Sequence, residues 1–99
     1  MYVLSERGLN MKYIEQVLEI QRMAYTLNGL GRYTAFVDYA GHVKMLRVCV
    51  YKGEWEPGKP PLFSTYSFAV EKWEDEWLQW FKDTGIQLQE LIGEGDINE

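Results

Sequence analysis

The chain has 99 residues, of which 46% are hydrophobic and 25% charged, a composition typical of one globular domain rather than of a disordered chain. Fifteen acidic residues against ten basic ones leave a net charge of −5, which repels phosphate backbones and anionic membranes and therefore argues against direct binding to nucleic acid or to a membrane. One cysteine, no signal-peptide pattern and no run of about eighteen apolar residues predict a cytoplasmic protein without an internal disulfide.

The first predicted element is an amphipathic helix from Asn10 to Asn28. Apolar residues recur there at helical spacing and would form its buried row: Tyr13, Val17, Ile20, Ala24 and Leu27. Asn10 has the side chain of an N-cap. Gly29 would end the helix, because glycine readily takes the left-handed conformation of a C-terminal cap.

Two strands are predicted next, because the spacing of the apolar residues changes from about 3.6 to about two. The runs are RYTAFVDY and HVKMLRVCVYK, and Ala40 and Gly41 between them indicate a tight hairpin in which the glycine supplies a positive φ. The second run has an aliphatic face, which we expect to line the core: Leu46, Val48 and Val50. Cys49 has apolar neighbours and is expected to be a small buried residue.

The segment GEWEPGKPP, residues 53–61, is predicted to be a loop, because three prolines and two glycines cannot sustain a ladder of backbone hydrogen bonds. LFSTYSFAV, residues 62–70, alternates again and predicts a third strand. Two short connections between three strands favour an antiparallel meander.

A second helix is predicted to begin near Glu71. Its apolar residues follow helical spacing over several turns: Trp73, Trp77, Trp80, Phe81, Leu88 and Leu91. Asp, Thr and Gly at positions 83–85 predict an interruption, at which the helix either ends before a short further helix or continues with a bend. The glycine-rich acidic residues 93–99 are expected to form a flexible tail.

Together these elements predict a single α+β domain over residues 1–92. Its order is helix, three-stranded antiparallel meander, helix (αβββα). Both helices are expected on one face of the sheet, because an apolar sheet face needs a cover.

The stretch WEDEWLQWF, residues 73–81, places three tryptophans on one face of the second helix and acidic residues elsewhere. One interpretation is that the aromatic face packs on the sheet as core. The other is that three indoles exceed what a small sheet covers, so that Trp80 and Phe81 are left for a partner protein. Trp55, between two glutamates in the loop, is a further partner-binding candidate, or else it folds back over an open edge of the sheet.

The acidic residues of the second helix also allow two interpretations. Glu74, Asp75 and Asp83 lie on or near its predicted exposed side, where carboxylates normally keep a helix face solvated. A spaced run of carboxylates can instead imitate phosphates and occupy the basic groove of a nucleic-acid-binding protein. These three residues are therefore candidate partner-binding residues as well.

Catalysis has one candidate pair. His42, the only histidine, lies near Asp38 across the predicted hairpin turn, and Tyr39 or Ser67 could act as the third member of a hydrolytic triad. The sequence has neither a nucleophile elbow nor an oxyanion-hole glycine motif, so a small hydrolase is kept only as an alternative. One histidine and one cysteine cannot form a tetrahedral zinc site, and the glycines form no nucleotide-binding motif. We therefore expect no enzyme activity, cofactor or metal.

The predicted element order is that of double-stranded-RNA-binding domains, but EKWEDEW, residues 71–77, is acidic where that family has a basic helix start, which excludes RNA binding. The layout and the acidity also resemble small acidic accessory proteins of phages and prophages of Gram-positive bacteria, among them anti-CRISPR inhibitors. This resemblance implies a non-enzymatic protein-interaction module that acts on a host protein. Fifteen aromatic residues exceed what a small monomer can hide, which predicts a homodimer.

Overall fold

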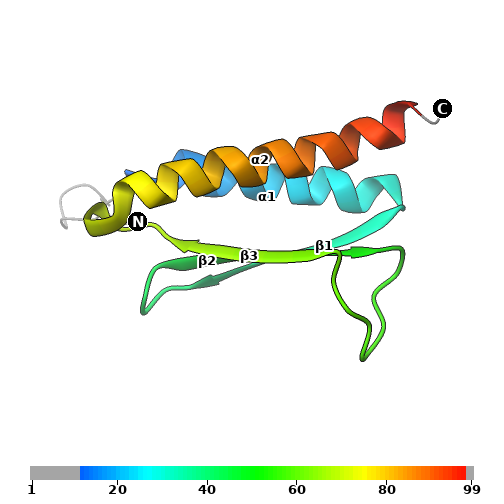
Figure 1. Ribbon diagram of the computed structural model, residues 1–99, viewed down its shortest axis with the longest axis horizontal. Coiled ribbons are helices and arrows are strands. Elements are labelled where there is room, and N and C mark those ends of the chain that lie inside the picture. The colour runs from blue at the N-terminus through cyan, green and yellow to red at the C-terminus, as the bar shows by residue number, and fades with distance from the viewer. Residues whose placement is uncertain (1–11, 98–99) are drawn as a thin grey trace, which may run out of the picture.

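The computed structural model of the chain describes residues 12–97, and the side chains of residues 12–94. Its elements are helix α1 (Ile14–Leu30), strands β1 (Tyr33–Ala40), β2 (Met45–Lys52) and β3 (Phe63–Phe68), the short 3₁₀ helix η2 (Glu71–Trp73) and helix α2 (Glu74–Ile97). The strands form one antiparallel sheet in the order β1-β2-β3, and both helices lie on the same face of it (Figure 1). The predicted fold class is confirmed.

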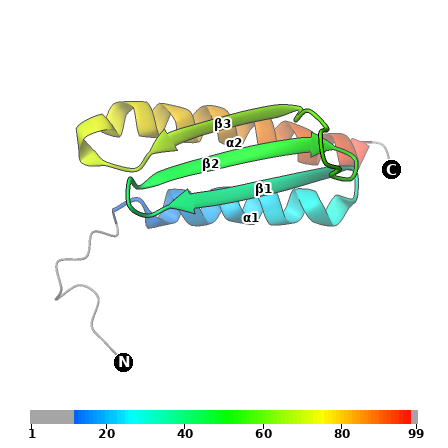
Figure 2. The same ribbon diagram turned by 90° about the horizontal axis from the view of Figure 1, so that it is seen from below.

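The core lies between the two helices and the face of the sheet that they cover. The central strand β2 contributes Leu46, Val48 and Val50, all fully buried, which confirms the predicted core face. The helices contribute further fully buried side chains: Ile20 and Leu27 from α1, and Trp77 and Leu88 from α2. Figure 2 shows the sheet from the opposite side, where the strands lie in front of both helices.

Helix α1 ends later than the sequence predicts. It spans Ile14–Leu30, and the predicted N-cap Asn10 lies outside the described residues. Gly29 stays helical, and the left-handed cap is Gly31, with a φ of 81°. Two nearby glycines offer two caps, and the later one is used because the chain turns directly from it into β1.

The hairpin between β1 and β2 has a four-residue turn, residues 41–44, rather than a tight turn at Ala40 and Gly41. Ala40 still belongs to β1, and its carbonyl oxygen accepts the N–H of Val43 at 3.2 Å. The positive φ, 56°, is at Lys44 and not at Gly41. The predicted position was wrong because strand pairing continues through Ala40, which moves the left-handed residue to the far end of a longer turn.

Helix α2 continues without a break through residues 83–85, where the sequence predicts an interruption. Thr84 is buried, and a Cβ atom on Gly85 would lie 3.5 Å from the Met23 side chain of α1. The two helices are in contact at this point, and their packing offsets the low helix propensity of glycine. Residues 93–97 are also helical, so α2 extends into the segment predicted as a tail.

Asn28, near the end of α1, protects the free edge of β1. Its side-chain Oδ1 accepts the backbone N–H of Ala35 at 2.8 Å, and its Nδ2 donates to the carbonyl oxygen of the same residue at 3.0 Å. The amide thus pairs with Ala35 as a neighbouring strand would. Because an open strand edge is a template for unwanted pairing, this contact shields part of the edge as well as joining α1 to the sheet.

Replacing Asn28 by alanine is expected to lower the free energy of unfolding by about 1–3 kcal/mol, because the partly buried N–H and carbonyl of Ala35 lose these partners. Urea denaturation measures the loss. Gln21→Ala is the control, since Gln21 is exposed on the same helix and its replacement changes little besides helix propensity. If both variants were equally stable, the edge contact would have no energetic role.

Candidate protein-interaction surface

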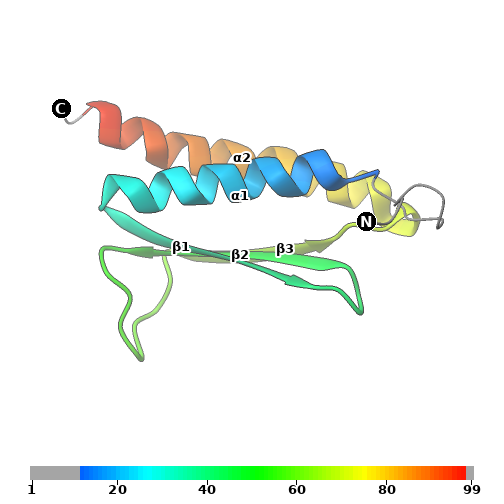
Figure 3. The same cartoon turned by 180° about the vertical axis from the view of Figure 1, so that it is seen from behind.

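The face of the sheet that points away from the helices, which we call the open face, carries apolar and aromatic side chains. Strand alternation and the pairing register place eleven residues on it: Thr34, Phe36, Asp38 and Ala40 from β1, Met45, Arg47, Cys49 and Tyr51 from β2, and Ser64, Tyr66 and Phe68 from β3. The loop of residues 53–62 projects on the same side, away from the helices (Figures 1 and 3). Antiparallel sheets with one solvated face normally carry mostly polar residues on it, so the four aromatic residues among these are unusual.

The first aromatic cluster consists of Phe36, Tyr51 and Trp55. The ring centroids of Phe36 and Tyr51 are 5.8 Å apart and those of Phe36 and Trp55 are 6.5 Å apart, both in edge-to-face geometry. Phe36 is 41% exposed and Trp55 is 48% exposed. Trp55 therefore folds back onto the open face and keeps nearly half of its surface accessible.

The base of the loop that carries Trp55 is held against the strands. Thr34 Oγ1 donates to the carbonyl oxygen of Gly53 at 2.8 Å, and Gly53 takes a φ of 73°, a conformation that favours glycine. Lys59 Nζ donates to two backbone carbonyl oxygens at the start of the loop. These contacts hold the base of the loop against β1 and the end of β2.

Tyr66, Phe68 and Trp73 form the second aromatic cluster. The ring centroids of Tyr66 and Phe68 are 5.8 Å apart and those of Phe68 and Trp73 are 5.3 Å apart, again edge to face. Tyr66 is 57% exposed and Trp73 is 42% exposed. A shallow pocket of about 270 Å³ adjoins the cluster and is lined by Ser67, Phe68, Trp73 and Glu76.

Trp73 does not share a helix face with Trp77 and Trp80, although the sequence predicts that it does. Residues 71–73 form the 3₁₀ helix η2, whose tighter winding breaks the rotation of about 100° per residue on which that prediction depends. Trp73 packs instead against Phe68 of β3. The rings of Trp77 and Trp80 are stacked, with centroids 5.4 Å apart, so two of the three tryptophans belong to the helix layer over the sheet.

An ion pair and the cysteine lie on the open face between the two clusters. Arg47 Nη2 is 3.0 Å from Asp38 Oδ2, across the β1–β2 pairing. Cys49 is half-buried, not fully buried as the sequence predicts, because the odd-numbered residues of β2 point away from the helices. Its hydrogen bond with Tyr51 is the main cause of the raised pKa of the Tyr51 hydroxyl.

Trp80 and Phe81, two of the predicted partner-binding residues, lie on the helix-covered side of the sheet. Both are partly buried and pack against the core. The Nε1–H of Trp80 donates to Thr65 Oγ1 on β3 at 2.8 Å. The structure therefore does not bring them together with Trp55, which lies against the open face.

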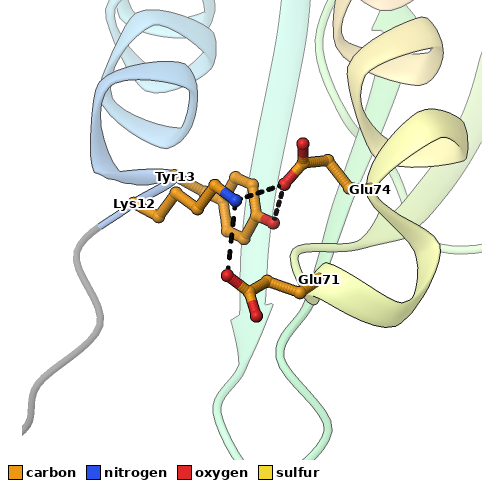
Figure 4. A network of polar contacts seen from close by, with 4 residues as sticks. All are labelled: Lys12, Tyr13, Glu71 and Glu74. Atoms are coloured by element: carbon orange, nitrogen blue, oxygen red, sulfur yellow. Dashed lines mark hydrogen bonds and ion pairs between the residues drawn. The ribbon is translucent and has the colours of Figure 1, made fainter.

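Glu74, at the start of α2, is engaged within the molecule (Figure 4). Its Oε1 accepts the hydroxyl of Tyr13 at 2.6 Å and lies 2.7 Å from Lys12 Nζ. The same Nζ lies 3.3 Å from Glu71 Oε2. These contacts join the start of α1 to the start of α2.

The other two acidic candidates, Asp75 and Asp83, are exposed on α2, and Asp83 accepts a hydrogen bond from Gln79 at 3.0 Å.

Charge is distributed unevenly along the chain. Residues 69–99 contain nine acidic and two basic residues, a net charge of −7. Residues 33–68, which form the sheet and its connections, have a net charge of +1. Their four basic and three acidic residues are Lys44, Arg47, Lys52 and Lys59, and Asp38, Glu54 and Glu56.

The contacts of Glu74 predict a pH dependence of stability. Hydrogen bonds with Lys12 first and Tyr13 second lower the pKa of Glu74 below its ordinary value of 4.5. A carboxyl group with a lower pKa in the folded state stabilises the fold above its unfolded pKa, and this contribution is lost as the pH falls through the folded pKa. The difference in unfolding free energy between wild type and Glu74→Gln should therefore be largest near neutral pH and disappear in acid.

Urea denaturation at a series of pH values from neutral to strongly acidic measures this difference. Asp75→Asn is the matched control, because it removes a neighbouring exposed carboxylate at the same helix end. If the difference in unfolding free energy between wild type and Glu74→Gln stayed constant over the whole pH range, the lowered pKa of Glu74 would be contradicted.

The sheet separates the members of the conceivable hydrolytic triad. Asp38 lies on the open face, whereas Tyr39 and Ser67 both pair with the buried Leu46 and so belong to the helix-covered side. His42 is exposed in the turn. Within the described residues, no group of three or more His, Cys, Asp or Glu side chains is arranged to hold a metal ion.

Four open-face residues were not predicted from the sequence as partner-binding residues: Phe36, Tyr51, Tyr66 and Phe68. A signal for them exists in the alternation of β2, because assigning its aliphatic row to the core places Tyr51 on the opposite face. Extending that inference to β1 and β3 needs the pairing register, which the sequence alone does not supply.

No protein-family model matches the chain, and comparisons with curated proteins and with solved structures found no significant match. In the part of the chain that the structure describes, neither helix is long and apolar enough to cross a membrane.

Proposed function

We propose that the chain is a non-enzymatic protein-interaction module that binds its partner through the open face. The observation that carries the proposal is the exposure of three rings on this side, Phe36, Trp55 and Tyr66, which are between 41% and 57% exposed. Trp73, packed against Phe68 at the edge of the face, adds a fourth ring that is 42% exposed. Aromatic side chains bury about 150–250 Å² each, so rings exposed to this degree present roughly 400 Å² of surface. This is about the size of the largest apolar patch on a typical monomer, and such patches are often functional.

The shape and chemistry of the open face favour a protein as the partner. The rings lie across a broad sheet face, and the pocket beside Trp73 holds only about 270 Å³, whereas small-molecule sites enclose most of their ligand. Tyrosine, tryptophan and arginine are the side chains that contribute most at the centres of protein interfaces. Tyr66, Trp55 and Arg47 supply all three here.

We place the partner among the proteins of a bacterial host. This part of the proposal rests on the resemblance in element order and acidity to accessory proteins of phages and prophages of Gram-positive bacteria. Such a module acts by occupying a surface of its target, so it needs no catalytic group of its own.

Affinity capture with matched variants tests the proposal. Tyr66→Ala removes a ring that is 57% exposed on the open face, and Tyr25→Ala removes a ring that is 83% exposed on α1. Truncating a ring at the centre of an interface costs about 2 kcal/mol or more, which is roughly 30-fold in affinity. A protein captured from bacterial lysate by the wild type should be lost with Tyr66→Ala and kept with Tyr25→Ala, while both variants melt near the wild-type temperature. Equal capture by the two variants would show that the partner binds elsewhere.

A second candidate function, favoured by the net charge of −7 over residues 69–99, is an acidic mimic of nucleic acid that inhibits a nucleic-acid-binding protein through α2. Exposed carboxylates would then carry the affinity. Asp75→Asn combined with Asp83→Asn should weaken capture, and added salt should weaken it steeply. Tyr66→Ala should have no effect in that case, so the same capture experiment separates the two candidates.

A further inference from the structure

We infer that the open face binds the open face of a second copy of the chain, so that two sheets pack face to face in a two-fold symmetric dimer. The inference rests on the proposed function of this face: a second copy occupies it when no host protein is bound, and the two compete for the same surface. In such a dimer one patch covers its own copy, and the helices of both copies lie on the outer sides.

Charge favours this contact over other contacts between two copies. The segment that contains α2 has a net charge of −7, so copies that met through it would repel each other. Residues 33–68 have a net charge of +1, and the open face itself carries one acid and one base, Asp38 and Arg47. Close approach of two open faces therefore brings together little net charge.

The ion pair of the open face is self-complementary. Arg47 and Asp38 lie between the two aromatic clusters, and their side chains are 51% and 59% exposed. A two-fold interface presents both charges from both copies, so Arg47 of one copy can approach Asp38 of the other. The guanidinium group has five N–H donors, enough to serve the carboxylates of both copies.

The size of the face matches what a dimer needs. An interface of standard size buries about 800 Å² on each partner. The four exposed rings contribute roughly half of that area, and the other open-face side chains and the projecting loop of residues 53–62 add to it (Figure 3). Two twisted sheets pack about 10 Å apart with interleaved side chains, so a second copy offers a surface of matching shape.

Cys49 provides a readout on the open face itself. It is the only cysteine of the chain and is half-buried on β2, so a maleimide reports on this face alone. The experiment measures the reaction rate of the wild-type thiol with N-ethylmaleimide over a range of protein concentrations, together with the mass from light scattering. At about ten times the dimer dissociation constant roughly one fifth of the chains are monomeric, so the rate should fall about fivefold as the mass approaches that of a dimer.

A charge exchange tests the self-complementary pair. Arg47→Glu leaves two acidic side chains at this point of every copy, and Asp38→Arg leaves two basic ones, so each variant alone should remain monomeric. An equal mixture of the two should form a heterodimer, because opposite charges again face each other. Tyr25→Ala, on α1, should dimerise as the wild type does. Thermal unfolding of each variant at low concentration separates loss of the dimer from loss of the fold.

Two outcomes would overturn the dimer. One is a wild-type mass that stays monomeric at the highest concentration with a constant thiol reaction rate, and loss of capture with Tyr66→Ala would then still support the proposed function. The other is a dimer whose thiol reacts as fast as that of the monomer, since its copies would meet through another surface. The proposed function fails separately if Tyr66→Ala alters neither capture nor dimer mass.

Discussion

Replacing Trp77 by alanine is expected to lower the free energy of unfolding by roughly 3–5 kcal/mol, the range for deleting a large buried aromatic side chain. The indole is fully buried, stacks on Trp80 with centroids 5.4 Å apart, and meets the ring of Tyr13 edge to face at 5.9 Å. Alanine would leave a cavity in the centre of the core that these rings cannot fill. Urea or thermal denaturation measures the loss.

Two further variants make this result specific to Trp77. The indole N–H of Trp77 has no hydrogen-bond partner among the described residues, so Trp77→Phe, which removes that group and keeps a ring, should cost clearly less than Trp77→Ala. Trp73→Ala should cost about 1 kcal/mol or less, because Trp73 is 42% exposed at the edge of the open face. If Trp77→Ala were no less stable than Trp73→Ala, Trp77 could not be the centre of the core.

The second large effect is expected for Leu46→Ala, which should lower the free energy of unfolding by about 2–5 kcal/mol. Leu46 is fully buried in the central strand, and it pairs with Tyr39 of β1 and Ser67 of β3. Its side chain therefore faces the helix layer, and alanine would leave an apolar cavity there. Chemical denaturation gives the value directly.

Arg47→Ala, the next residue on the same strand, is the matched control. Its side chain is 51% exposed on the open face, and exposed ion pairs such as the one with Asp38 contribute about 1 kcal/mol or less. A slip of the strand by one residue would exchange the two faces. A larger loss for Arg47→Ala than for Leu46→Ala would therefore show that the register of β2 is wrong.

The regular elements could be predicted because they are encoded in short-range periodicity. Ile20, Ala24 and Leu27 recur at helical spacing and are buried in α1, and Leu46 and Val48 alternate and are buried in β2. Proline and glycine between residues 53 and 61 likewise exclude a strand through their own backbone chemistry. None of these inferences requires knowing what the element packs against.

The details that the sequence did not predict depend on contacts between distant segments. Gly85 stays helical because α1 approaches α2 at that point, as the distance to Met23 shows. Lys44, not Gly41, has the positive φ, because the pairing of β1 with β2 sets where the turn ends. Trp73 does not lie on the helix face that carries Trp77 and Trp80, because the chain passes from β3 into a 3₁₀ turn before α2 begins. Local propensity favours other outcomes at each of these positions, and tertiary packing overrides it.

By itself, the sequence determined the order of the elements, the buried rows of α1 and β2 and the charge of the last segment, all of which follow from composition and local spacing. It also singled out Trp55, because a large ring in a proline-rich loop stands apart from any periodic pattern. Only the tertiary structure decided that Phe36 and Tyr66 share one surface with it. Alternation shows which residues of a strand point the same way, but the placement of both helices on one side determines which of the two faces is left open.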